Sequence, residues 1–298
     1  MKKDKINTGY ALLFGISYLH ALLPLKALYV LSDILYFFVY HVVRYRRKIV
    51  RKNLVNAFPD LSEKEIKAIE KQYYRHLGDY YVETIKILHI SDEEMKKRMV
   101  FENPEIINQL TKDGRWCFLA LGHYANWEWV PSIGLHTPVG LETAQIYKKL
   151  KNKSFDRLFF KIRSRFHPLS IEKNDTLRTI IREKEEGKTM IVGFVADQRP
   201  QRKSIHYWTH FLHQDTPVQT GMERIARKMG FSMAYLDIKK VKRGYYRAQI
   251  VALTPNASQE PEFALTEQYM RHFEQSILRD PACYLWSHNR WKFKREQI

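Results

Sequence analysis

The chain has 298 residues, with 50 lysines and arginines against 32 aspartates and glutamates, so its formal net charge is +18. Hydrophobic residues make up 45% of it, which is enough for a sizeable core and excludes a disordered chain. Cys117 and Cys283 each lie in an apolar run, which excludes a disulfide framework and a cysteine-rich zinc site. The charge predicts an anionic partner: nucleic acid, a membrane surface, a phosphorylated lipid or an acidic protein.

Two apolar runs come first, at residues 10–25 and 27–43, each at or below the ~17–25 residues that a membrane-spanning helix needs. The basic block RYRRKIVRK follows at 44–52. A basic block beside an apolar helix suits the anionic cytoplasmic face of a bilayer. The pattern therefore favours an apolar membrane-anchoring segment with a basic exit over residues 1–52, ahead of one domain at 53–298. A buried helical hairpin with a solvated basic exit is the alternative.

Helix and strand signals alternate along the rest of the chain. Capping boxes at 62–65 and 91–94 predict two helix starts. Further patterns predict buried strands at 116–121 and 189–196, helices at 175–186, 219–229 and 262–279, and a hairpin that joins 231–239 to 245–253. Buried strands interleaved with helices predict an α/β fold with a central mixed sheet flanked by helices. Chemistry in such sheets gathers where strands end at their carboxyl side.

The strongest local signal is the sequence GHYANWE at 122–128, directly after a predicted strand. If His123 lies in the strand-to-helix turn and Glu128 one turn into the helix, Glu128 can accept the imidazole N–H. The other ring nitrogen is then free to act as a general base for a hydroxyl. A histidine that merely caps the helix is the alternative. Cys117 lies in mid-strand, where burial should raise its pKa, so a covalent cysteine intermediate is disfavoured.

Two other polar groups are candidates for a site. Asp197 and Gln198 leave a predicted strand into a loop that ends at Pro200, and they are either site residues or a turn with a helix cap. A helical stretch carries basic residues that could clamp phosphates or stabilise oxyanion charge, or that could form a plain solvated face: Arg157, Lys161, Arg163 and Arg165.

The last two candidates are rich in aromatic residues. The stretch HYWTHFLH at 206–213 has histidines at helical spacing but no helix start signal, so a polar wall or loop is favoured over a metal site. The C-terminal stretch at 284–292 mixes aromatic and basic residues, which suits either stacking on single-stranded nucleic acid or a membrane interface.

Taken in order, these motifs resemble the lipid A late acyltransferase family, the lauroyl/myristoyl acyltransferases of lipopolysaccharide assembly. The resemblance covers nearly the whole chain. Its matching pieces after the apolar N-terminus are Arg47-x3-Arg51-x-Asn53-Leu54-x2-Ala57-Phe58-Pro59, Gly122-His123-x4-Glu128, the arginine-rich helix, Asp197-Gln198, the Thr-Pro-x2-Thr-Gly stretch at 216–221, and Trp286-x-His288-x-Arg290-Trp291.

The resemblance implies a glycerolipid-acyltransferase-like fold and makes residues 53–298 the acyltransferase domain. It implies an inner-membrane enzyme, its catalytic domain facing the cytoplasm, that moves an acyl chain from acyl carrier protein to a hydroxyl of an anionic lipid A precursor. No cofactor and no metal are expected. The implied catalytic dyad is His123 with Glu128. The expected transition-state or substrate-binding residues are Arg165, with Arg163 as the nearby alternative, Asp197, Gln198 and Asn126.

Two alternatives remain open at this point. A lysophospholipid or aminolipid acyltransferase would use the same dyad on a different acceptor. A basic nucleic-acid-binding protein is the alternative outside the enzymes. The apolar N-terminus and the absence of an RNP, KH or zinc-finger signature argue against nucleic acid as a partner.

Overall fold

The computed structural model describes residues 8–297, so residues 1–7 of the predicted N-terminal segment lie outside it. Within that range a central sheet has seven strands in the order β1-β9-β8-β2-β5-β3-β4. All neighbours run parallel except β8 and β9, which form an antiparallel hairpin. The strands are β1 (Met99–Phe101), β2 (Cys117–Leu121), β3 (Leu141–Tyr147), β4 (Leu169–Glu172), β5 (Thr189–Val195), β8 (Ser232–Lys242) and β9 (Tyr245–Thr254).

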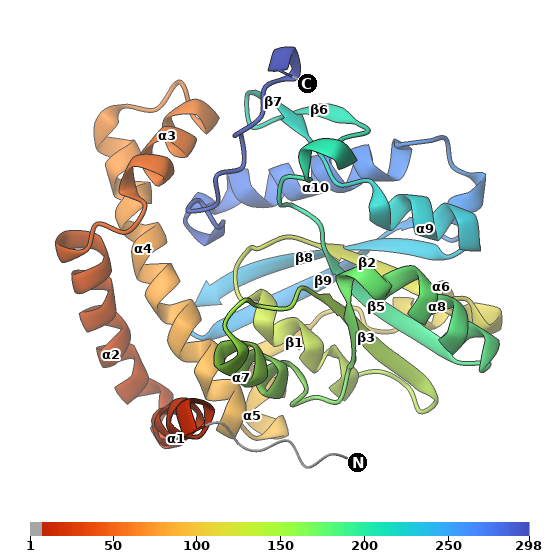
Figure 1. Cartoon of the computed structure of the whole chain (residues 1–298), viewed down its shortest axis with the longest axis horizontal. Coiled ribbons are helices and arrows are strands. Elements are labelled where there is room, and N and C mark those ends of the chain that lie inside the picture. The colour runs from red at the N-terminus through yellow and green to blue at the C-terminus, as the bar shows by residue number, and fades with distance from the viewer. Residues whose placement is uncertain (1–7, 298) are drawn as a thin grey trace.

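Helices cover the sheet, which confirms the predicted α/β class with a mixed sheet. They include α5 (Asp92–Arg98), α6 (Ile106–Leu110), α7 (Lys153–Arg163), α8 (Thr176–Glu185), α9 (Gly221–Met229) and α10 (Ala264–Arg279). Figure 1 shows α9 and α10 above the sheet and α7 below it. A separate two-stranded sheet, β6 (Trp208–Phe211) with β7 (Gln214–Pro217), lies above α10 in the same view.

The N-terminal part is a layer of helices along one end of the sheet (Figure 1). It comprises α1 (Thr8–Leu22), α2 (Leu25–Phe37) with a π-helical continuation (Phe38–Val42), α3 (Arg47–Ala57) and the long α4 (Glu63–Lys86). The segment Leu25–Val42 is long and apolar enough to cross a membrane, and only 22% of it is buried. The boundary predicted after residue 52 falls within α3, and the division into two parts stays a prediction.

Most predicted elements are present because their signals are local. Ser62 and Glu65 make the reciprocal hydrogen bonds of a capping box at the start of α4. At the start of α5 the Ser91 hydroxyl accepts a hydrogen bond from the Glu94 amide, which is one of the two bonds of the predicted capping box. Gly230 ends α9 in the left-handed conformation that favours glycine. The predicted strands and the hairpin correspond to β2, β5, β8 and β9, whereas β3 and β4 have no counterpart in the sequence patterns.

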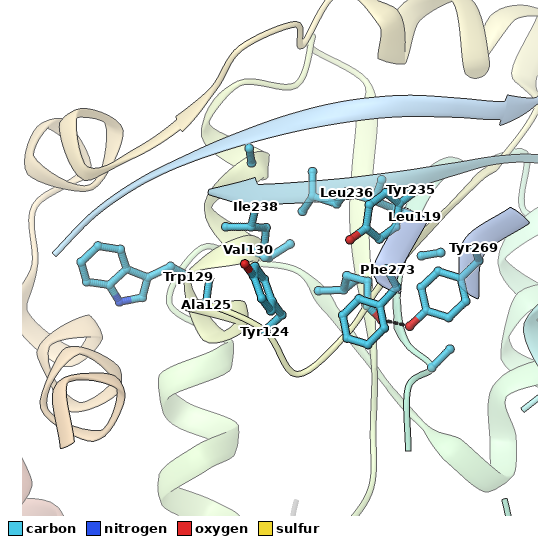
Figure 2. Packing of buried hydrophobic residues seen from close by; sticks show 14 of the residues in the cluster. Leu119, Tyr124, Ala125, Trp129, Val130, Tyr235, Leu236, Ile238, Tyr269 and Phe273 are labelled. Atoms are coloured by element: carbon cyan, nitrogen blue, oxygen red, sulfur yellow. Dashed lines mark hydrogen bonds between the residues drawn. The ribbon is translucent and has the colours of Figure 1, made fainter. Parts of the chain in front are cut away.

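The core beneath the site is aromatic. Figure 2 shows Tyr269 and Phe273 of α10 packed beside Tyr235 of β8 and Leu119 of β2, with Tyr124 on the loop that follows β2. The Tyr269 hydroxyl donates a hydrogen bond of 3.0 Å to the carbonyl of Leu121, the last residue of β2. This contact fixes the carboxyl end of β2 against α10.

The register of the sheet brings two distant loops together. Strands β2 and β5 are parallel neighbours, and Leu121 pairs with Val195 at their carboxyl ends. The Ala196 amide extends the ladder by donating to the Leu121 carbonyl at 3.0 Å. His123 and Asp197 therefore leave the sheet side by side, at the edge where the sequence predicts the chemistry.

Candidate active site

The loop that carries His123 is held on two sides. A Cβ on Gly122 would lie 2.2 Å from the Phe273 ring, so α10 packs closely enough here to require glycine. On the other side the Ala125 amide donates to the Cys283 carbonyl at 2.9 Å, and the Leu285 amide donates to the His123 carbonyl at 3.1 Å. The C-terminal segment thus runs beside the histidine loop and fixes its backbone.

His123 is paired with Asp197. The imidazole Nδ1 lies 2.6 Å from Asp197 Oδ1, and the His123 amide donates to the same oxygen at 3.1 Å. Burial by itself raises the pKa of Asp197, but the charge and hydrogen bonds of His123, with a smaller contribution from Arg290, hold that pKa below its ordinary value. An ionised Asp197 accepts the Nδ1 proton, which leaves Nε2 as the basic nitrogen of the ring.

Glu128 has a different partner from the one predicted. It accepts two hydrogen bonds from Arg163, from Nε at 2.9 Å and from Nη2 at 2.5 Å. Tyr80 donates a longer bond of 3.4 Å to the same carboxylate. The sequence predicts that Glu128 accepts the imidazole N–H, but the structure gives that position to Asp197. The reason is the sheet register, which places Asp197 directly beside the histidine.

A cavity of about 460 Å³ opens beside His123. Its walls are largely apolar, with Trp127, Val130, Phe194, Met222 and Ile225 among the lining residues. The polar side chains on its lining include His123, Glu128, Arg163 and Gln198. A concave apolar chamber with a few convergent polar groups at one place is the usual form of a small-molecule or acyl-chain site.

Gln198 and Trp127 lie against the His123 imidazole ring. The Gln198 amide nitrogen is 3.3 Å from His123 Nε2. The Trp127 ring meets the imidazole edge-on, with 5.1 Å between their centroids. Gln219 donates to the Gln198 carbonyl at 2.8 Å and so fixes this part of the cavity. His123 Nε2 consequently faces the cavity between one polar and one aromatic neighbour.

Two predicted site residues lie elsewhere. Asn126 is buried beneath the loop and donates to Glu83 on α4 at 2.6 Å, away from the cavity lining. Arg165 lies beyond the end of α7, where it donates to Asp92 at 2.9 Å. Of the two arginines considered for the site, Arg163 therefore lines the cavity and Arg165 does not. The two residues are close in sequence, but α7 ends at Arg163 and the chain turns away after it.

Two lysines that line the cavity were not identified from the sequence patterns. Lys148 follows β3 and Lys173 follows β4, so both emerge at the same carboxyl edge as His123 and Asp197. The rule that predicts chemistry at strand ends would have identified them, but β3 and β4 lack the continuous apolar run by which β2 and β5 are recognised. Burial and the charge of Lys148 lower the pKa of Lys173.

The remaining candidates have structural roles. Tyr284, Trp286 and Arg290 are buried, so the C-terminal stretch does not present the stacking surface that a nucleic-acid interface needs. The histidine-rich stretch forms strand β6 and its turn, and residues 8–297 contain no cluster of three metal-ligating side chains. Burial raises the pKa of the Cys117 thiol to about 12, which confirms that it is a poor nucleophile.

Comparison with known proteins gives a consistent result. The profile of the bacterial lipid A biosynthesis acyltransferase family matches residues 3–293. A lipid A biosynthesis acyltransferase of Haemophilus influenzae is 25% identical over 85% of this chain and 79% of its own. A palmitoleoyltransferase of Escherichia coli K12 is 25% identical over 83% and 79%, and a lauroyltransferase of the same organism is 24% identical over 95% and 91%. Both are named as enzymes of lipid A biosynthesis.

Proposed function

The chain belongs to the bacterial lipid A biosynthesis acyltransferase family and is therefore an acyltransferase, and we propose that it transfers a fatty acyl chain from acyl carrier protein to a hydroxyl of a lipid A precursor. The observation that carries this proposal is the His123–Asp197 pair at 2.6 Å, with Nε2 facing an apolar cavity of about 460 Å³. The pair can remove a proton from a hydroxyl, and the cavity can hold a hydrocarbon chain beside it.

The proposed reaction is a direct transfer without an acyl-enzyme. His123 Nε2 takes the proton of the acceptor hydroxyl while that oxygen attacks the thioester carbonyl. Asp197 stabilises the imidazolium that forms. When the tetrahedral intermediate collapses, the carbon–sulfur bond breaks, and the imidazolium returns its proton to the leaving thiolate. The products are an oxygen ester and a free thiol, and the thioester itself supplies the activated acyl group, so no cofactor is needed.

The cationic side chains at the cavity support the proposal that the substrates are anionic. Arg163 is neutralised by Glu128, whereas Lys148 and Lys173 both line the cavity and form no ion pair with a carboxylate among residues 8–297. Acyl carrier protein is acidic as a class, and lipid A precursors carry phosphates. A chain with a formal charge of +18 attracts both by long-range electrostatics.

We further propose that α1 and α2 attach the protein to the inner membrane, with the acyltransferase domain facing the cytoplasm. Large apolar side chains are exposed on both helices, including Leu12 at 66%, Leu19 at 65% and Val30 at 60%. A soluble protein rarely leaves so contiguous an apolar surface uncovered. The exposed basic residues at the start of α3, next to this surface, suit anionic lipid headgroups.

Acyl transfer by the purified protein tests the proposal. We expect product from a phosphorylated lipid A precursor and one or more acyl carrier protein thioesters of different chain length. The variant His123→Ala should lose ~10²–10⁴-fold in turnover, because a general base contributes about that much. His210→Ala, an exposed histidine on β6, is the matched control and should retain wild-type activity.

Two results would count against this function. A folded His123→Ala protein with near-wild-type turnover would exclude the mechanism. Transfer to a lysophospholipid or an aminolipid in the same assay, without transfer to the lipid A precursor, would keep the chemistry but replace the acceptor.

A further inference from the structure

Ala125, two residues after His123, has a backbone conformation that residues with a side chain rarely adopt. Its φ is 52°, which lies in the left-handed region. A Cβ comes too close to the following carbonyl oxygen there, and only glycine enters the region without this steric cost. Such strain persists only where the surrounding structure holds it, and it is often found at functional sites. The acyl-transfer steps described above do not use this residue.

The turn at Ala125 allows Trp127 to contact His123. After Ala125 the chain begins the 3₁₀-helix Trp127–Leu135. The Trp127 ring then meets the His123 imidazole edge-on, with 5.1 Å between their centroids. On its other side the same ring stacks on Tyr80 of α4 at 4.1 Å. The conformation of Ala125 therefore decides whether the indole packs against the His123 ring.

Both backbone polar groups of Ala125 have partners outside the histidine loop. Its amide donates to the Cys283 carbonyl at 2.9 Å. Its carbonyl oxygen lies 3.1 Å from Nε2 of His76, a residue of α4. Ala125 is fully buried and His76 is 5% exposed, so water does not replace this bond if the imidazole is removed. Loss of the imidazole would leave a buried carbonyl unpaired at the strained residue, which costs more than the bond itself contributes.

The two neighbours of the His76 ring require the same tautomer. A carbonyl can only accept a hydrogen bond, so the Ala125 carbonyl requires the proton on Nε2. On the other side of the ring, Nζ of Lys240 lies 3.2 Å from Nδ1, and an ammonium can only donate. Asp79 of α4 lies 3.6 Å from the same ammonium. Burial, together with the charge of Lys240, lowers the pKa of His76 to about 3, so the ring is neutral near pH 7.

We propose that His76 is a positioning residue of the acyl-transfer site: its Nε2–H holds the Ala125 carbonyl, maintains the left-handed turn, and so keeps Trp127 against the His123 imidazole. His76 acts through the loop, since it does not line the cavity. Lys240 acts one step farther away, because it determines which nitrogen of His76 carries the proton. The inference rests on the proposed function for its catalytic meaning, but the hydrogen bond and the turn do not depend on that function.

Steady-state kinetics of purified variants test this role. His76→Leu should lower kcat by about 10–100-fold, the cost of an unpaired buried carbonyl expressed as a rate, with little change in KM because the cavity lining stays intact. His76→Gln keeps an N–H donor at the position of Nε2 and should keep most of the activity. His272→Leu, at an exposed histidine on α10, is the matched control and should leave kcat unchanged.

A second substitution separates the turn from a general loss of packing. Ala125→Gly in the His76→Leu background should recover most of the lost kcat, because glycine adopts the left-handed turn without support. Wild-type kcat in folded His76→Leu would overturn the proposal, and so would a loss that Ala125→Gly does not reduce. If His76→Leu does not fold, His76→Asn replaces it, since the shorter amide lies at the position of Nδ1 and does not reach the Ala125 carbonyl.

NMR spectra of the nitrogen-15 histidine-labelled protein test the arrangement without any substrate. His76, assigned by the absence of its signals in His76→Gln, should be neutral with its proton on Nε2. The His123 ring signals, assigned with His123→Ala, should shift in His76→Leu as the Trp127 ring moves, and should return when Ala125→Gly is added. A proton on Nδ1 of His76, or unshifted His123 signals, would overturn the proposal. If the wild-type protein transfers no acyl chain, the proposed function fails, but these spectra still decide what His76 does.

Discussion

Two carboxylates beside the cavity differ in their tasks because their partners differ. Asp197 accepts two hydrogen bonds from His123, one from the ring and one from the backbone amide. Glu128 is tied to Arg163 by two hydrogen bonds in the fork geometry that suits guanidinium and carboxylate. The first arrangement sets the orientation and tautomer of the His123 imidazole, whereas the second positions the Arg163 cation on the cavity wall.

This difference predicts distinct kinetic effects. Asp197→Asn should lower kcat by ~10²–10⁴-fold with little change in KM, because the amide no longer holds the imidazole with Nε2 unprotonated. Glu128→Gln should act mainly by releasing Arg163 and raising KM. Steady-state kinetics of the two purified variants decide this, with Asp237→Asn, paired to Arg279 at 2.6 Å, as a control. The opposite pattern, with kcat lost only in Glu128→Gln, would favour a His123–Glu128 dyad.

A third carboxylate, Glu83 on α4, supports the histidine loop from below. It accepts hydrogen bonds from Asn126 at 2.6 Å, Tyr246 at 2.8 Å and Tyr29 at 3.0 Å. Burial is the main cause that raises its pKa from 4.5 to about 6. The folded protein therefore holds this proton more tightly than the unfolded chain does.

The sign of the effect on stability follows from that difference. Glu83 contributes stability that is complete below pH 4.5 and is lost as the pH rises through about 6. In Glu83→Gln this decline should disappear, so the change in the free energy of unfolding between pH 4.5 and about 6 should differ from that of the wild type by about 2 kcal/mol. Urea unfolding at a series of pH values measures it, with exposed Glu262→Gln as the control. If the free energy of unfolding varied with pH in the same way in both variants, Glu83 would not be the source of the decline.

At the scale of elements, α2 is attached to the rest of the protein by close packing and by ion pairs. Gly78 of α4 is so near α2 that a Cβ there would lie 2.9 Å from the Ser32 carbonyl oxygen. Arg243, at the tip of the β8–β9 hairpin, pairs with Asp33 of α2 and Asp79 of α4. The hairpin, α2 and α4 are therefore joined at one point.

Matched glycine substitutions test that contact. Gly78→Ala should destabilise the protein by about 1–3 kcal/mol, because the added methyl group pushes backbone against backbone. Gly15→Ala in α1 has no atom within 4 Å of the new Cβ and should stabilise by about 0.5–1 kcal/mol through helix propensity alone. Chemical denaturation in detergent compares them. Equal effects of the two substitutions would mean that α2 does not pack closely on α4.

At the scale of the whole molecule, apolar and basic surfaces lie next to each other at the N-terminal end. The exposed apolar side chains of α1 and α2 lead directly into exposed Arg44, Lys48 and Lys52. Helices α8 and α9 lie on the far side of the molecule from α1 and α2 (Figure 1). These three basic residues thus lie next to the apolar surface, in the position where a bound bilayer would place its headgroups, whereas basic residues on α8 and α9 do not.

Binding to lipid vesicles tests this arrangement. Replacing Arg44, Lys48 and Lys52 by glutamine should weaken binding to anionic vesicles by about 1 kcal/mol per residue and leave binding to neutral vesicles unchanged. The same loss of charge through Arg178→Gln, Arg224→Gln and Lys228→Gln on α8 and α9 should have little effect. Flotation with vesicles of both compositions measures it. Equal losses of vesicle binding in both triple variants would show that the total charge of the protein, and not this basic surface, attracts the vesicles.

The sequence by itself determined the local features of this protein. Capping boxes, apolar runs and the Gly230 helix end act over a few residues, so they specify α4, α5, α9, β2 and β5 without knowledge of the fold. The ordered motifs likewise indicate the family and select His123, Glu128, Asp197 and the Arg163–Arg165 region. Strands β3 and β4 were not predicted because polar residues interrupt their apolar ones, and the two lysines that follow these strands were missed for the same reason.

Only the tertiary structure decided which of the selected groups meet. Asp197 is 74 residues from His123, and the parallel pairing of β2 with β5 brings them together. Spacing along the chain pointed to Glu128 instead, because a five-residue offset is visible in a sequence and a strand register is not. The choice of Arg163 over Arg165 and the burial of Asn126 have the same cause. Side-chain partners across a core are set by packing between distant segments, which local sequence patterns do not encode.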